Sequence, residues 1–146
     1  MPSLGQSKYC VDRDATTLAY SQGGKGGADT CNCSGCRNFR LARAKVFPAE
    51  FIVLLDQLGI DPSKDGEVYH NGQMAPGRHD YAGWFHFVGE LTETGDFTPI
   101  TLAEGFTVYL CPASAPRLAS LERLPVVQLE FHVVSVPWLL DEPEPM

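Results

Sequence analysis

Residues 48–62 read PAEFIVLLDQLGIDP, and this stretch predicts a helix with well-marked ends. Its large apolar side chains recur at i, i+3, i+4 and i+7, the spacing of one helical face that packs on a core: Phe51, Leu54, Leu55 and Leu58. Pro48 suits the first turn, and Gly59 can adopt the left-handed conformation that ends a helix. We therefore expect the helix to end at about Leu58.

A second helix is predicted just before it, over Arg37–Val46, with its start near Gly35. Phe39, Ala42 and Val46 fall on one stripe at helical spacing. Four of the 11 basic residues of the chain lie in this short stretch: Arg37, Arg40, Arg43 and Lys45. They suit an anionic partner, but a solvated helix face that offsets nearby thiolates and acidic groups is the favoured interpretation.

After Asp61 the pattern changes from helices to strands. The predicted strands are Glu67–His70, Tyr81–Leu91, Phe106–Cys111 and Val126–Val136, with turns at Asn71-Gly72 and Thr94-Gly95-Asp96. In the last strand, apolar residues alternate with Gln128, Glu130 and His132, as in a sheet with one buried face. The expected fold class is α+β, with two consecutive helices packed on a mainly antiparallel sheet.

The first 30 residues are expected to contain an edge hairpin and a loop. Lys8–Asp12 and Thr16–Tyr20 are predicted as its two strands. Gly23–Gly27 holds four glycines in five residues, so it is expected to be a mobile surface loop. We expect residues 1–140 to form one globular domain, and the acidic, proline-rich residues 141–146 to be disordered or to lie against the surface.

Composition excludes several classes of function. With 146 residues, 44% of them hydrophobic, and a net charge of −7 at pH 7, the chain does not suit non-specific attraction to nucleic acid or to anionic membranes. No apolar run approaches the roughly 20 residues of a membrane span. The N-terminal residues lack the pattern of a cleaved secretion signal, so a cytoplasmic location is expected, with a protein or a small molecule as partner.

The chemistry of the chain is expected to centre on its five cysteines: Cys10, Cys31, Cys33, Cys36 and Cys111. An odd number, in the absence of a secretion signal, argues against a disulfide framework. Residues 31–36 follow the pattern C-x-C-x2-C, in which a tight turn before a helix brings three thiolates towards one point, as tetrahedral Zn²⁺ requires. We expect zinc to be bound by Cys31, Cys33 and Cys36.

The fourth zinc ligand decides the type of site. Cys111 is the first choice, with Cys10 or a histidine as alternatives. A fourth protein ligand makes the metal structural, which is the favoured interpretation and suits a small binding protein. Water or a substrate thiol in that position instead suits an enzyme acting on a small thiol-containing substrate. Two further alternatives need no metal: a thiol oxidoreductase using Cys33 and Cys36, and partly buried cysteines without a role in chemistry.

A resemblance to a known family supports the zinc interpretation. Cys31-Asn-Cys33-Ser-Gly-Cys36-Arg37 resembles the C-x-C-x-x-C-R stretch of the glutathione-dependent formaldehyde-activating family, small zinc proteins in which this stretch holds one zinc ion. Phe106–Pro116 is similar to the family's later F-C-x-x-C-G segment, with Ser114 in place of the second cysteine. The family's earlier C-x-C-G stretch has no counterpart, so the resemblance implies a local zinc site and not the formaldehyde–glutathione reaction. Three other stretches resemble segments of small bacterial proteins and imply no activity: Leu58–Asp61, Tyr81–Gly89 and Pro137–Glu142.

Histidines are the remaining candidates for acid–base chemistry. Strand alternation places His86 on one face with Glu90, and His132 on one face with Glu130, so neighbouring strands can bring a histidine and a carboxylate together. A hydrogen-bonded sheet histidine is the favoured interpretation of both. His79 falls in a predicted turn from which it can reach a metal.

Overall fold

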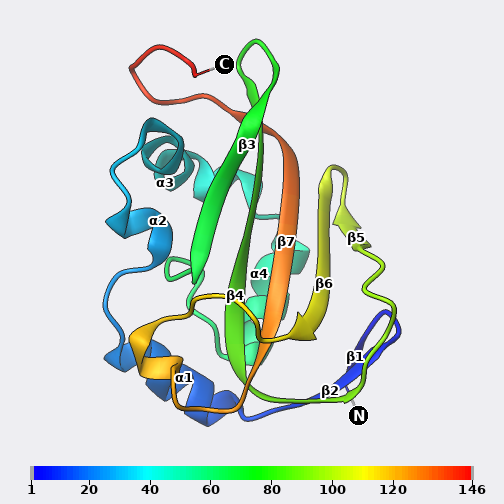
Figure 1. Cartoon of the computed structure of the whole chain (residues 1–146). Helices are drawn as coiled ribbons and strands as arrows, with labels where there is room; N and C mark the ends of the chain where they lie inside the picture. The colour runs from blue at the N-terminus through cyan, green and yellow to red at the C-terminus, as the bar shows by residue number, and fades with distance from the viewer. Residues whose placement is uncertain (1, 146) are drawn as a thin grey trace.

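A computed structural model describes residues 2–145 and shows an α+β fold (Figure 1). The helices are α1 (Arg13–Gln22), α2 (Gly27–Thr30), α3 (Ser34–Val46), α4 (Ala49–Leu58) and a short 3-10 helix, η1 (Ala119–Leu121). The strands are β1 (Ser3–Leu4), β2 (Ser7–Val11), β3 (Glu67–Ala75), β4 (Arg78–Glu93), β5 (Ile100–Ala103), β6 (Phe106–Pro112) and β7 (Val126–Pro137). None of the helices in this part of the chain is long and apolar enough to cross a membrane.

The strands form one sheet in the order β1-β2-β4-β7-β6-β5, and β3 also pairs with β4. All the pairings are antiparallel. The long strand β4 has two partners on the same edge, since β3 pairs with its first part and β2 with its last part. In Figure 1, α3 and α4 lie behind the sheet, and most of the facing side of β3, β4, β7 and β6 has no helix over it.

The core lies between the helices and the sheet and is rich in aromatic rings. Its fully buried phenylalanines come from both layers: Phe39, Phe51, Phe85, Phe87, Phe106 and Phe131. The ring of Phe51 on α4 lies 4.7 Å from that of Phe106 on β6. At the end of α4, Gly59 has a φ of 81°, and the N–H of Ile60 donates to the carbonyl of Leu55 at 2.9 Å. The predicted end of this helix is confirmed, because it depends on residues that are neighbours in sequence.

The helical layer contains more than the two helices expected. Those two are present as α3 and α4, but α1 and α2 precede them. The predicted strand Thr16–Tyr20 is wrong, because these residues belong to α1. The side chain of Asp12 accepts a hydrogen bond from the Ala15 N–H at 3.0 Å, and this N-cap outweighs the strand preference of the threonines.

Two glycine-based predictions also differ from the structure. Asn71-Gly72 does not form the turn, since β3 continues to Ala75 past an irregularity in its pairing with β4. The predicted mobile loop at Gly23–Gly27 is packed against the protein at Gly26, which is buried. A Cβ atom added to Gly26 would lie 2.7 Å from the Lys64 Cα. The glycine thus permits close packing of two backbone segments.

Candidate metal centre

The three cysteines of the C-x-C-x2-C pattern lie at the junction between α2 and α3. Cys31 is the C-cap residue of α2, Cys33 is the N-cap residue of α3, and Cys36 is in the first turn of α3. One ligand atom from each lies within 4.8 Å of the other two. The structure therefore brings these three thiols together, as their spacing predicts.

Each thiol has a different environment. Cys33 is exposed, and its sulfur accepts a hydrogen bond from the Cys36 N–H at 3.3 Å, in the place where a serine or aspartate oxygen usually caps a helix. The Cys31 sulfur is 3.3 Å from the Cys33 sulfur. Cys36 is buried, with its sulfur 3.9 Å from the carbonyl of Val68 on β3. The group thus extends from the surface to the edge of the core.

Buried contacts hold α2 against the loop between α4 and β3. The carboxylate of Asp65 is buried and accepts a hydrogen bond from the Ala28 N–H at 3.1 Å, while its backbone carbonyl accepts one from Gly27 at 2.9 Å. These contacts satisfy donors at the start of α2 that the short helix leaves unpaired. Burial raises the pKa of Asp65 to about 6.

The basic residues of α3 bind the same junction. Arg40 donates to the Asp29 carbonyl at 2.9 Å, and Arg43 forms an ion pair with the Asp29 carboxylate at 3.2 Å. Arg37 donates to the carbonyl of Asn32 at 3.0 Å, which fixes the loop between Cys31 and Cys33. These contacts give three of the four basic residues a structural explanation within the fold.

The three thiols could hold a metal ion. Zinc–sulfur bonds of about 2.3 Å place the sulfurs of a tetrahedral site about 3.8 Å apart, a separation that small side-chain movements can reach from the group described. Burial raises the pKa of Cys36, whereas a hydrogen bond from the Cys33 backbone lowers that of Cys31. Three adjacent thiolates repel one another, so a divalent cation is the natural partner for full ionisation of the group.

Cys111 and Cys10 lie outside this group. Cys111 is buried on β6, with its sulfur 3.3 Å from a carboxylate oxygen of Glu130. Cys10 is exposed on β2, opposite Glu90 on β4. Within residues 2–145, the group that can hold a metal consists of three cysteines, without a fourth histidine, cysteine or acidic residue. The structure does not bring Cys111 to this group, because β6 lies two strands away from β4, beyond β7, whereas Cys36 contacts β3 on the other side of β4.

The predicted sheet histidines have other partners than those expected. His86 is buried, with Nε2 3.1 Å from the Gln128 side-chain oxygen, and burial lowers its pKa to about 4. His132 lies with Nε2 2.8 Å from both carboxylate oxygens of Asp80. Strand alternation did not reveal Asp80, because the predicted strand starts at Tyr81, whereas β4 starts at Arg78.

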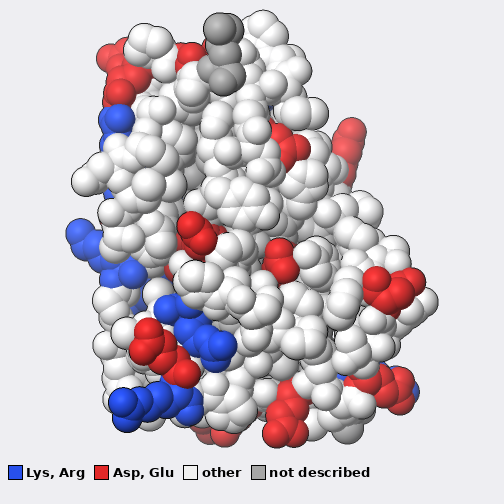
Figure 2. Space-filling model, in the orientation of Figure 1, with Lys and Arg blue, Asp and Glu red and all other residues white. Residues whose placement is uncertain are grey.

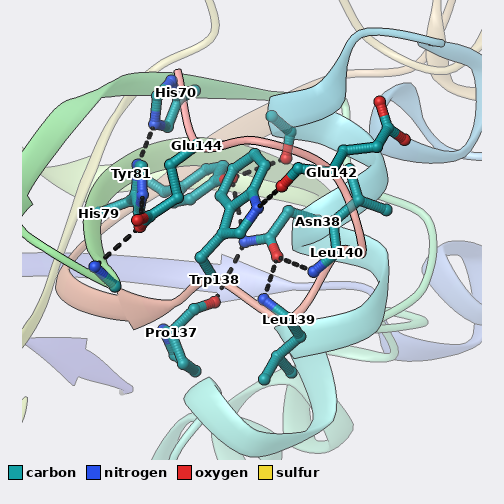
Figure 3. A network of polar contacts seen from close by, with 12 residues as sticks. Asn38, His70, His79, Tyr81, Pro137, Trp138, Leu139, Leu140, Glu142 and Glu144 are labelled. Carbon is teal, nitrogen blue, oxygen red and sulfur yellow. Dashed lines mark hydrogen bonds and ion pairs between the residues drawn. The ribbon is translucent and has the colours of Figure 1, made fainter. Parts of the chain in front are cut away.

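His79 is not in a turn but fully buried on β4, where it joins His70 to the C-terminal residues (Figure 3). His70 Nε2 is 2.7 Å from His79 Nδ1, and His79 Nε2 is 2.9 Å from a carboxylate oxygen of Glu144. Gly35 at the start of α3 packs against His70, so this chain of three side chains lies beside the α3 N-terminus. No pattern in the sequence links Glu144 to His79, which are 65 residues apart.

The C-terminal residues lie along α3 (Figure 3). Buried Asn38 accepts hydrogen bonds from the N–H groups of Leu139 at 2.6 Å and Leu140 at 3.1 Å. Arg37, next to Cys36, forms an ion pair with Glu142, including a contact of 3.0 Å. As far as it is described, to residue 145, the predicted tail therefore lies against the surface; Met146 is outside the described residues.

No protein-family model, curated protein or solved structure matches this chain. The resemblance of residues 31–37 to the formaldehyde-activating zinc stretch therefore stays a local prediction. The chemistry of the thiol group is the basis for the function proposed below.

Proposed function

We propose that this chain is a zinc-binding protein in which Cys31, Cys33 and Cys36 hold one Zn²⁺ at the α2–α3 junction. The supporting observation is the convergence of three thiol ligand atoms within 4.8 Å of one another. Zinc is the metal proposed because thiolates are soft ligands and zinc accepts tetrahedral sulfur coordination. All five cysteines are free, which suits a reducing compartment such as the cytoplasm.

The proposed role of the metal is mainly structural. Helix α2 has four residues, far fewer than a helix needs to be stable alone, and Cys31 is the residue that follows its end. Zinc bound to Cys31, Cys33 and Cys36 would tie this turn to α3. The surface held in this way would bind a protein or a small molecule rather than transform a substrate.

Metal content tests the proposal directly. We expect elemental mass spectrometry to find about one zinc per chain in full-length protein purified without chelator. The Cys10→Ser variant is the control and should contain the same amount of zinc, because Cys10 lies outside the thiol group. The Cys33→Ser variant should lose the metal yet keep its helix start, because a serine oxygen is a good N-cap. Folded wild-type protein without metal, or full retention in Cys33→Ser, would overturn the proposal.

A second candidate function is a zinc enzyme with an open coordination position for a small thiol. It is favoured by the exposed Cys33 and by a group limited to three ligands within residues 2–145. Adding 2-mercaptoethanol to Co²⁺-substituted protein should change the cobalt absorption spectrum if the position is open, and an unchanged spectrum would indicate a closed site.

Metal-free protein with a reversible Cys33–Cys36 disulfide would instead support the thiol oxidoreductase hypothesis.

A further inference from the structure

A pocket of about 300 Å³ lies on the face of the sheet opposite α3 and α4. Along β7, Phe131 is buried in the core, whereas its neighbours Glu130 and His132 point to this other face. The side chains that define the pocket come from three strands: Tyr69, Asn71, Tyr109, Glu130 and His132. None of them belongs to the proposed zinc site.

Strand register explains why a hollow forms here. Ala82 on β4 pairs with Tyr69 on β3 and with His132 on β7. Tyr109 on β6 is opposite Glu130 on β7. Because alanine is much smaller than its neighbours on the same face, the side chains around it form walls, and Ala82 forms part of the floor.

One wall of the pocket presents a carboxylate held in place by its neighbours. The Gln128 side chain donates to Glu130 Oε2 at 3.1 Å, the Cys111 sulfur lies 3.3 Å from the same oxygen, and the Tyr109 hydroxyl also forms a hydrogen bond with this carboxylate. A carboxylate has two oxygens and about four acceptor positions, so these three contacts leave acceptor capacity. Glu130 can therefore accept hydrogen bonds from a ligand without losing the contacts that orient it.

The opposite wall also offers acceptors. Asn71 donates through its nitrogen to Asp80 at 2.7 Å, which directs the amide while its oxygen keeps acceptor capacity. Asp80 also holds His132, with both carboxylate oxygens 2.8 Å from Nε2. A ligand that uses the acceptors of Asn71 and Glu130 must supply hydrogen-bond donors.

The charge around the pocket is negative. Its lining includes no lysine or arginine. Burial raises the pKa of Tyr69, and the negative charges of Glu130, Glu67 and Asp80 raise it further. These three carboxylates therefore make the electrostatic potential at Tyr69 negative. In Figure 2 the middle of this face shows acidic groups on an uncharged surface, while basic groups lie towards the left and lower-left edges. Such a surface attracts cations.

We propose that this pocket binds a small organic cation, with its ammonium group on Glu130 and its alkyl part against the rings of Tyr69 and Tyr109. Aromatic faces attract cations, and tyrosine rings also cover short alkyl chains. The volume of about 300 Å³ is at the lower end for ligand pockets, which limits the ligand to a small molecule or one side chain. The site is independent of the thiol group and of any metal there.

A ligand series on wild-type protein tests the proposal without any variant. The probes are n-butylammonium, neutral n-butanol and anionic butyrate at constant ionic strength, followed by two-dimensional ¹H–¹⁵N NMR of the full chain. We expect n-butylammonium to shift amides of β3, β6 and β7 around the pocket, and the other two probes to bind at least about tenfold more weakly. Equal binding of n-butanol, or shifts confined to other surfaces, would overturn the proposal.

Matched variants identify the groups responsible. Glu130→Gln keeps the shape and the acceptor for Gln128 but removes the charge, so n-butylammonium should bind at least about tenfold more weakly. Glu122→Gln changes an exposed acidic residue that does not line the pocket and should leave affinity unchanged. Tyr109→Leu should weaken binding by removing the ring. Unchanged affinity in folded Glu130→Gln would contradict the assignment, and zinc content should be unaltered in all three variants.

Discussion

At the scale of the residue, two buried ionisable groups respond to pH in opposite directions. Burial raises the pKa of Asp65 to about 6, so its contribution to stability is complete below about pH 4 and is lost as the pH rises through about 6. Burial lowers the pKa of His86 to about 4, so its contribution is complete above about pH 6.5 and is lost as the pH falls through about 4. Between about pH 4 and 6.5, Asp65 therefore lowers the free energy of unfolding of the wild type as the pH rises, whereas His86 raises it.

In the Asp65→Asn variant, the pH dependence of the free energy of unfolding that comes from Asp65 should disappear, and the dependence that comes from His86 should remain. The amide oxygen can still accept the hydrogen bond from Ala28, while the cost of a buried charge is removed. Urea unfolding of Asp65→Asn should show a free energy of unfolding that rises by up to about 3 kcal/mol between pH 4 and 7, and that exceeds the wild type at pH 7 by about 1–3 kcal/mol. Exposed Asp14→Asn should follow the wild-type profile. A profile for Asp65→Asn identical to wild type would contradict the role of this carboxyl.

At the scale of the element, the helices differ in how far their own residues define them. For α4, a four-residue apolar stripe and Gly59 are local signals, and both its ends were predicted closely. For α1, the threonines favour a strand, and the deciding signal is the single N-cap residue Asp12. The Asp12 N–H also donates to the Val88 carbonyl at 2.8 Å, so the cap joins the helix start to β4.

Removal of this cap should destabilise α1. Asp12→Ala loses the side-chain acceptor for Ala15 and should lower the free energy of unfolding by about 1 kcal/mol, whereas Asp12→Asn should retain most of the stability. Chemical denaturation monitored by circular dichroism measures the difference. Asp14→Ala in the same turn is the control, since Asp14 is exposed and does not cap the helix. Equal stability of Asp12→Ala and Asp14→Ala would show that the cap does not define this helix.

At the scale of the whole molecule, Asn38 connects parts of the chain that are distant in sequence. It is fully buried on α3 and donates to the Pro137 carbonyl at 3.1 Å, while its oxygen accepts from Leu139 and Leu140. Its amide nitrogen is also 3.4 Å from the hydroxyl of Tyr81 on β4. One amide therefore joins helix, sheet and C-terminal residues.

Asn38→Ala should be strongly destabilising, because it removes the partner of three part-buried backbone groups, at Pro137, Leu139 and Leu140. We expect a loss of about 2–4 kcal/mol in the free energy of unfolding, together with faster amide hydrogen exchange at Leu139 and Leu140. Asn32→Ala is the matched control: Asn32 is exposed, and Arg37 contacts only its backbone carbonyl. Unchanged exchange at Leu139 in folded Asn38→Ala would show that another contact holds the C-terminal residues.

The local part of this protein could be predicted from sequence, and the parts that join distant segments could not. Helices α3 and α4, the five strands β2, β3, β4, β6 and β7, and the approach of Cys31, Cys33 and Cys36 depend on residues within a few positions of one another, where spacing alone restricts geometry. Only the tertiary structure decided the separation of Cys111 from the thiol group, the contact of His79 with Glu144 across 65 residues, and the pocket beside Glu130. The physical reason is that strand order, register and irregular pairing arise from packing of the whole sheet, and a local pattern of residues does not contain them.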